Sequence, residues 1–256
     1  DNSVLAIIIV GQGNTFPAGA DIKEFGNPPK SPLLPLICNK IEALEKPVIC
    51  SMHGTVLGGG LEIALSCHYR LATIKTKLGL PEVHLGLIPG AGGTQRLPRL
   101  IGLPEAFKIA ASGLPISAKK AVEIGLIDEI IENIKDDSII FTNKVISLNK
   151  KISRTCDITK HLNKSPDTNR EMSELRVSFS KSHRGQVAPG KIADCIEATL
   201  EMPFDKGQEL ERATFAKLLS TDQSKALIHA FFAERKSSKI PEASKITPRP
   251  VNKIGV

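Results

Sequence analysis

The sequence predicts an α/β fold that continues into a helical C-terminal region, and three observations support this prediction. Residues 3–11 and 47–52 are short apolar runs rich in β-branched side chains, as in strands buried on both faces. Residues 35–44 lie between them with apolar positions at helical spacing, so a parallel βαβ unit is expected. Apolar positions also recur at helical spacing in four segments after residue 170.

Helices and strands continue to alternate after this βαβ unit. Ser117 is expected to cap the helix that follows it, and Gly113 and Gly125 are expected to follow the C-terminal ends of helices. The expected elements are a helix at 61–67, a strand at 69–74, helices at 94–101, 104–112 and 117–124, and a strand at 126–131.

The later part of the chain is expected to be helical. Residues 149–169 are polar with little periodicity and predict an exposed connection. The expected helices are at 171–182, 190–201, 205–219 and 223–236. These patterns divide the chain into an α/β core at 1–132, a helical region at 133–236, a linker at 237–250 and the start of another domain at 251–256.

Composition narrows the class of protein. The chain has 256 residues, of which 41% are hydrophobic and 24% charged, as in globular proteins. The formal net charge of +7 favours acidic partners such as phosphorylated ligands, an anionic surface or nucleic acid, or else reflects a solvated basic surface. Five widely spaced cysteines indicate a reducing compartment and neither a disulfide framework nor a metal site. The apolar run at 4–10 is too short to span a bilayer, so we expect a soluble protein.

Two loops rich in small residues are candidate anion sites. Residues 58–60 are three glycines before a helix, where first-turn N–H groups lack partners and face the positive end of the helix dipole. The loop at 16–23 could supply a second donor, the N–H of Ala20, with Asp21 as a cap. The alternatives are a tight strand-to-helix turn for the glycines and a capped surface turn for the loop.

Two glutamates interrupt hydrophobic runs and are candidate acid/base residues. Glu62 lies in the first turn of an apolar helix, and Glu82 follows a proline among apolar residues. Partial burial of a carboxylate requires partners or a raised pKa, which favours function. The alternatives are a charge that complements the helix dipole for Glu62 and a solvated loop for Glu82.

Other familiar sites are not indicated. The glycines at 90–93 do not form a dinucleotide fingerprint, because Gln95 stands where that motif needs glycine. Neither a Walker lysine nor a serine elbow is present, and the six histidines show no metal spacing and are interpreted as structural. We therefore expect no metal and no cofactor for this domain.

Several motifs, in this order and spacing, resemble the crotonase (enoyl-CoA hydratase/isomerase) superfamily. They are the segments at 18–23, 46–49, 58–62, 80–82 and 86–96. The resemblance implies a crotonase-like ββα spiral with a helical C-terminal region. By the same resemblance, the first β-hairpin and helix of the family are expected to be missing before Asp1.

The resemblance also implies a reaction, the hydration of trans-2-enoyl-CoA, with enoyl-CoA isomerisation as a second activity. Ala20 and Gly59 would form the oxyanion hole, Glu62 would activate water, and Glu82 would protonate the α-carbon. The implied substrate and CoA contacts are Ala18, Ala20, Asp21, Ile22, Lys23, Gly59 and Gly90.

Residues 59–70 and 225–236 more narrowly resemble the family of peroxisomal bifunctional enzymes of fatty-acid β-oxidation. In that family a Rossmann-fold 3-hydroxyacyl-CoA dehydrogenase domain follows, so NAD is implied for that domain and the peroxisome as location. Many hydratases have a CoA-binding lysine where Glu234 stands here, beside Arg235 and Lys236, so the phosphate contact is expected to shift.

Three alternatives stay open from the sequence. Within enzymes, the chain could be an isomerase-dominated or hydrolase-type crotonase, although those often lack one of the two glutamates. Some crotonase relatives bind RNA, but the basic residues here are scattered and few aromatic side chains are available for stacking. A folded but inert assembly module is the third. Enoyl-CoA thioesters are the expected partners, with no nucleic acid and no membrane.

Overall fold

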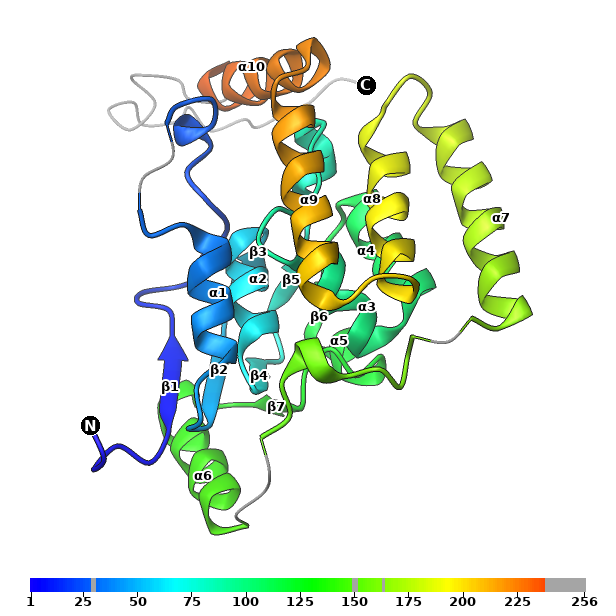
Figure 1. Ribbon diagram of the computed structural model, residues 1–256. Coiled ribbons are helices and arrows are strands. Elements are labelled where there is room, and N and C mark those ends of the chain that lie inside the picture. The colour runs from blue at the N-terminus through cyan, green and yellow to red at the C-terminus, as the bar shows by residue number, and fades with distance from the viewer. Residues whose placement is uncertain (29–30, 149–151, 163, 238–256) are drawn as a thin grey trace, which may run out of the picture.

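The computed structural model describes residues 1–28, 31–148, 152–162 and 164–237. Two small sheets lie at the centre of the N-terminal part (Figure 1). The first has four parallel strands in the order β1 (Ile7–Val10), β2 (Val48–Met52), β4 (Tyr69–Thr73) and β7 (Glu129–Ile131). The second joins β3 (Thr55–Leu57), β5 (Lys77–Gly79) and β6 (Ile116–Ser117).

The predicted βαβ unit is confirmed, but the two strands differ in burial. β2 is buried along its whole length, because it pairs with β1 on one side and β4 on the other. β1 is at the edge of the described sheet, and Val10 is 50% exposed. The prediction that this first strand is buried on both faces is therefore wrong. An apolar run of this length is also compatible with a half-buried edge strand.

The remaining helices of the first half follow the predicted order closely, whereas β3, β5 and β6 of the second sheet have no counterpart among the predicted elements. The helices of the first half are α1 (Leu34–Glu42), α2 (Gly59–Ser66), α3 (Gly93–Ile101), α4 (Leu103–Ser112) and α5 (Ala118–Glu123). Short 3-10 helices are η1 (Ile22–Glu24), η2 (Pro81–Leu85), η3 (Thr155–Asp157) and η4 (Ala198–Leu200). Ser117 caps α5 by accepting from Lys120 N, and Gly113 ends α4 in the left-handed conformation, as predicted.

The helical C-terminal region is also as predicted. Its helices are α7 (Pro166–Ser182), α8 (Ala188–Glu197), α9 (Phe204–Leu219) and α10 (Asp222–Ser237). α8 packs against α4, and α9 packs against α3, so this region completes the large hydrophobic core. The predicted linker beyond residue 237 and the predicted domain start at 251–256 lie outside the described residues.

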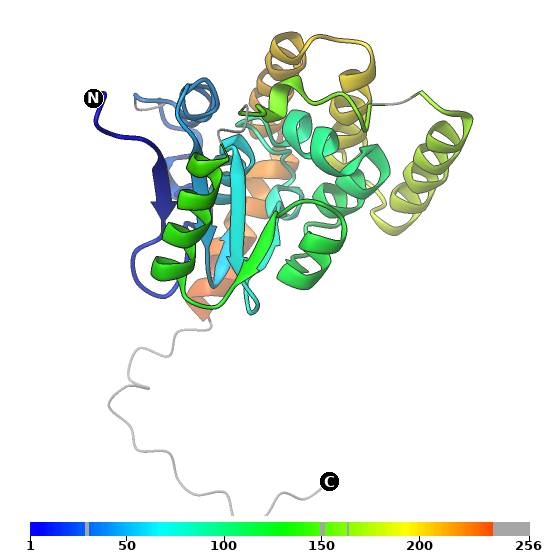
Figure 2. The ribbon, with the colours of Figure 1, turned by 90° about the horizontal axis from the view of Figure 1, so that it is seen from below.

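One helix has no counterpart among the predicted elements. α6 (Ile134–Ser147) lies along the four-stranded sheet, as Figure 2 shows in green. Phe141 meets Tyr69 of β4 edge to face, and Ser138 Oγ lies 2.6 Å from Ser51 Oγ of β2. This helix was not predicted because its apolar residues do not form a single stripe along one side. Ile140, for example, is 66% exposed. The helix after residue 132 thus covers the sheet.

The expected exposed connection at 149–169 is wrong at η3, while the other described residues of this segment are exposed or half-buried. Thr155 in η3 is buried, and its Oγ1 donates to Leu65 O at 2.9 Å. The backbone N–H of Cys156 donates to Glu42 Oε1 at 2.9 Å. Thr155 is buried here because a backbone carbonyl accepts from its hydroxyl group, and the Glu42 side chain accepts from the next backbone N–H.

Candidate active site

Glu62 is held at the start of α2 by backbone donors from another segment. Gly58 precedes the helix with φ 53°, a conformation that favours glycine, and the first turn then turns Glu62 inward, where it is 3% exposed. Its Oε1 accepts from Ala91 N at 2.7 Å and from Gly93 N at 2.9 Å. One oxygen is therefore fixed by two amides, while Oε2 has no hydrogen bond among the described residues.

Glu82 faces the same glycines from η2. A Cβ built on Gly58 would lie 2.9 Å from Glu82 Oε1, so only glycine fits there without displacing the carboxylate. The residue as a whole is partly exposed, but its Oε2 is buried and has no hydrogen-bond partner within the described residues. A buried carboxyl oxygen without a donor is costly when charged, so the protonated form is favoured.

The two carboxyl groups have unequal proton affinities. Burial raises the pKa of both. For Glu62 the N–H groups of Ala91 and Gly93 and the charge of Arg96 oppose this rise. For Glu82 the charge of Glu62 adds to burial and holds the pKa well above its usual value. Glu82 therefore holds its proton more tightly than Glu62 does.

Two backbone N–H groups, of Gly59 and Ala20, lie beside this pair. A Cβ built on Gly59 would lie 3.7 Å from Ala20 N, so the start of α2 and the 18–23 loop are adjacent. Within the described parts of the chain, neither N–H is bonded to an acceptor. The predicted partners of an oxyanion hole are thus brought together, and Asp21 caps η1 as expected by accepting from Lys23 N.

A groove of about 870 Å³ runs from this loop to the last described helix. It is lined by Ala18, Gly19, Ala20, Asp21, Ile22, Lys23, Phe231, Phe232, Arg235 and Lys236. Figure 1 shows α10 crossing above the 18–25 segment. Gly90 is not part of this lining, because it packs against the ring of Phe215, which a Cβ on Gly90 would approach to 2.9 Å.

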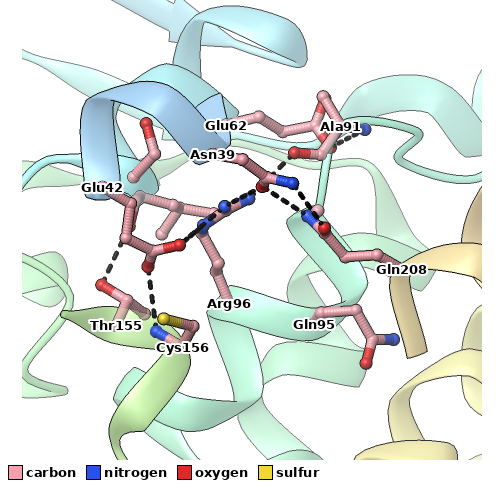
Figure 3. A network of polar contacts seen from close by, with 12 residues as sticks. Asn39, Glu42, Glu62, Ala91, Gln95, Arg96, Thr155, Cys156 and Gln208 are labelled. Carbon is pink, nitrogen blue, oxygen red and sulfur yellow. Dashed lines mark hydrogen bonds and ion pairs between the residues drawn. The ribbon is translucent and has the colours of Figure 1, made fainter. Parts of the chain in front are cut away.

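Behind the glutamates lies a buried polar network with Arg96 at its centre (Figure 3). Arg96 is fully buried and pairs with Glu42 Oε2 at 2.8 Å through Nη2. Its Nη2 also donates to Asn39 Oδ1 at 2.7 Å, and its Nη1 donates to Ala91 O at 3.0 Å. Gln208 of α9 donates to Asn39 Oδ1 at 3.0 Å. Three distant segments thus fix the Ala91–Gly92 peptide, which lies between the two peptides whose N–H groups hold Glu62.

Sequence reasoning missed two buried carboxyl groups, that of Glu42, which pairs with Arg96, and that of Glu211 in α9. Glu211 is fully buried and accepts from Gly92 N and Thr94 N at 2.6 and 2.8 Å. A signal was available, because Glu211 lies seven residues before the buried Leu218 and so falls on the buried face of the predicted helix. Arg96 and Asn39 gave no such signal.

The histidine interpretation holds for His68, which is buried between backbone groups. Its Nδ1 accepts from Val48 N at 2.9 Å, and its Nε2 lies 3.1 Å from Glu42 O. A search of the described residues finds no group of three or more metal-binding side chains. No helix in the described ranges is long and apolar enough to cross a membrane.

The profile of the enoyl-CoA hydratase/isomerase family matches residues 1–186. The chain belongs to this family. A solved enoyl-CoA hydratase/isomerase structure from Pseudoalteromonas atlantica T6c has a TM-score of 0.64 and 22% identity, covering 91% of this chain and 81% of that chain. This likeness confirms the predicted crotonase fold with its helical C-terminal region.

Two curated relatives carry the name peroxisomal bifunctional enzyme. The Danio rerio protein is 39% identical over 240 residues, which cover 93% of this chain and 33% of the relative. The Homo sapiens protein is 37% identical over 263 residues, which cover 100% of this chain and 36% of the relative. The chain therefore spans about a third of the length of these relatives.

Proposed function

We propose that this chain adds water to trans-2-enoyl-CoA to give 3-hydroxyacyl-CoA in fatty-acid β-oxidation. The observation that carries the proposal is the juxtaposition of Glu62 and Glu82, two buried carboxyl groups of unequal proton affinity. They lie beside two backbone N–H groups, of Gly59 and Ala20, that have no acceptor among the described residues. Family membership supplies the chemical context.

The backbone donors would act on the thioester oxygen. As water adds to C3, the electron pair of the C2–C3 double bond moves toward the carbonyl and leaves negative charge on this oxygen. The N–H groups of Gly59 and Ala20 would stabilise that charge by about 3 kcal/mol each in a dry site. Because both belong to fixed backbone, little reorganisation is needed when the charge develops.

The carboxyl groups would move the two protons. Glu62, ionised and with Oε2 free, would take a proton from the water as its oxygen bonds to C3. Glu82, protonated in the resting site, would donate its proton to C2. The two steps add H and OH and leave Glu62 protonated and Glu82 ionised, and a proton transfer then restores the starting state. With the double bond at C3, the same groups could move a proton between C4 and C2, which is isomerisation.

The groove beside the 18–23 loop is proposed to hold CoA. Lys23, Arg235 and Lys236 bring positive charge to its lining, which suits the nucleotide phosphates. Glu234, where many hydratases have a CoA-binding lysine, is absent from this lining, and its neighbours are present. This supports a phosphate contact shifted by one or two residues. Gly90 would then lie on the acyl side, beside Phe215.

The relatives support a place in a larger enzyme. We propose that this chain corresponds to the N-terminal hydratase part of a peroxisomal bifunctional enzyme, because both curated relatives carry that name. An NAD-dependent dehydrogenase domain and a peroxisomal location would follow. The domain boundaries predicted above are part of this proposal.

The deciding experiment follows the loss of the conjugated enoyl absorbance of a short trans-2-enoyl-CoA. We expect turnover by the wild type and a loss of about 10² to 10⁴ in kcat for Glu82→Gln and for Glu62→Gln, with binding of CoA thioester retained. Glu174→Gln makes the same change at an exposed position on α7 and should leave turnover unchanged. Near-normal turnover in either active-site variant would refute the assignment.

A further inference from the structure

Four consecutive backbone amides near the site alternate between two carboxylates. The N–H groups of Ala91 and Gly93 donate to Glu62 Oε1. The N–H groups of Gly92 and Thr94 donate to Glu211 Oε1 and Oε2, at 2.6 and 2.8 Å. Gly92 has φ 101°, a left-handed conformation that allows the amides to point alternately to opposite sides.

All the hydrogen bonds that the described residues give to Glu211 come from this short segment. Besides the two amides, its Oε2 accepts from Thr94 Oγ1 at 2.5 Å. The residue is fully buried and does not line the groove that begins at Ala18. Its carboxyl group is therefore placed to act on the backbone and not on a ligand in that groove.

We propose that Glu211 is a positioning residue that fixes the amides of 91–94 so that two of them hold Glu62 in its reactive orientation. The inference rests on the proposed hydratase function. Neighbouring peptide planes share a Cα atom, so a displacement of the Gly92 amide that shifts either shared Cα atom also moves the amides of Ala91 and Gly93. Loss of Glu211 would also leave two buried N–H groups without an acceptor, which favours such a displacement.

The charges in the site are compatible with this role. Burial first, and then the charge of Glu62, raise the pKa of Glu211 to about 8. The charge of Glu62 acts on Glu211 because both carboxyl groups accept from neighbouring amides of the same segment. The peptide between Ala91 and Gly92 is held at both ends, because its N–H donates to Glu211 and its carbonyl oxygen accepts from Arg96.

The test compares Glu211→Gln with Glu209→Gln, an exposed glutamate on the same helix. Glutamine has one acceptor oxygen and one NH₂ donor, so one of the two amides, of Gly92 or Thr94, must then face a donor. We expect kcat to fall by roughly 10- to 100-fold with KM changed by less than about threefold, because only the geometry of Glu62 is disturbed. Glu209→Gln should match the wild type.

A double-mutant cycle separates positioning from a general loss of structure. If Glu211 acts through Glu62, then Glu211→Gln should cause no further loss of kcat in the Glu62→Gln background. A full additional loss in that background would overturn the inference. Glu211→Asp, which keeps the carboxylate, should recover part of the activity, and it serves as the second variant if Glu211→Gln folds poorly.

Amide hydrogen exchange tests the inference without any assay of turnover. Exchange at residues 91 and 93 should become faster in Glu211→Gln and stay unchanged in Glu209→Gln. Unchanged exchange at these residues would refute the positioning role even if the wild type is an active hydratase. A wild type without turnover would refute the proposed function, while the exchange result would still decide the role of Glu211.

Discussion

Gly60 lies directly against the carbonyl oxygen of Pro17. A Cβ built on Gly60 would be 1.8 Å from that oxygen and 2.6 Å from the carbonyl carbon. The first turn of α2 and the loop that carries Ala20 are therefore in backbone contact. This contact sets the separation between the two N–H groups of the proposed oxyanion hole.

Gly60→Ala is expected to push this loop away from α2. We expect an overpacking cost of about 1–3 kcal/mol in the free energy of unfolding and a loss of kcat, because Ala20 N–H would move relative to Gly59 N–H. Urea unfolding and the enoyl absorbance assay check the two effects. Equal kcat in Gly60→Ala and the wild type would contradict the proposed hole.

Gly190→Ala is the matched control for this change. Gly190 lies in α8, is exposed, and a Cβ there would meet nothing within 4 Å. Alanine has the higher helix propensity, so we expect a gain of up to about 1 kcal/mol and unchanged turnover.

Arg96→Met is expected to destabilise the protein by about 3–5 kcal/mol, because it leaves the Glu42 carboxylate buried without its cation. Urea unfolding measures the loss. The double variant with Glu42→Gln should recover part of it, since no buried charge then remains unpaired. Arg212→Met, at an exposed position of α9, is the control. Equal losses of unfolding free energy in Arg96→Met and Arg212→Met would contradict a stabilising role of the Arg96–Glu42 ion pair.

Glu211 should make stability fall as pH rises. Its pKa is raised from the usual 4.5 to about 8 in the folded state, first by burial. Between these two values the unfolded chain releases the proton while the native protein holds it, so the free energy of unfolding decreases with pH. Glu211→Gln removes this contribution. We expect its unfolding free energy to decrease less than that of the wild type between pH 5 and about pH 8. If the unfolding free energies of variant and wild type had the same pH dependence, this would contradict a raised pKa of Glu211.

Lys236→Gln should weaken the binding of CoA without slowing the chemical step. We expect KM for the CoA thioester to rise several-fold with kcat unchanged, since a remote phosphate contact contributes uniform binding. A truncated thioester without nucleotide phosphates should show no difference. Lys217→Gln, at an exposed position on α9 outside the groove, is the control. A rise in KM for both substrates would argue against a phosphate contact.

Much of the fold could be predicted from the sequence, because its signals are local. Gly113 and Ser117 end and start helices through backbone conformation and a single cap, which neighbouring residues determine. The burial of β1 and the existence of α6 were harder to predict from the sequence. Whether an apolar strand is central or at an edge depends on its neighbours in the sheet, and α6 is held by contacts such as Phe141 with Tyr69.

Some residues of the candidate site could be predicted from the sequence, and others could not. Glu62 and Glu82 could be predicted because each is a carboxylate in an apolar run, and the structure brings both to the glycines at 58–60. Gly90, predicted as a substrate or CoA contact, does not line the groove beside the 18–23 loop, and its contact with substrate stays a prediction. Glu211 was missed because its role depends on a contact with residues more than 100 positions away.

The link between Glu211 and the 92–94 amides has a consequence for synthesis of the protein. Glu211 follows Gly92 by 119 residues and Thr94 by 117 residues in the chain. A nascent chain that has emerged from the ribosome only as far as α8 already contains both glutamates of the proposed catalytic pair, but two of the buried amides beside Glu62 still lack their acceptor. We expect such a chain to be folded in part and catalytically silent, so that activity begins only when α9 docks.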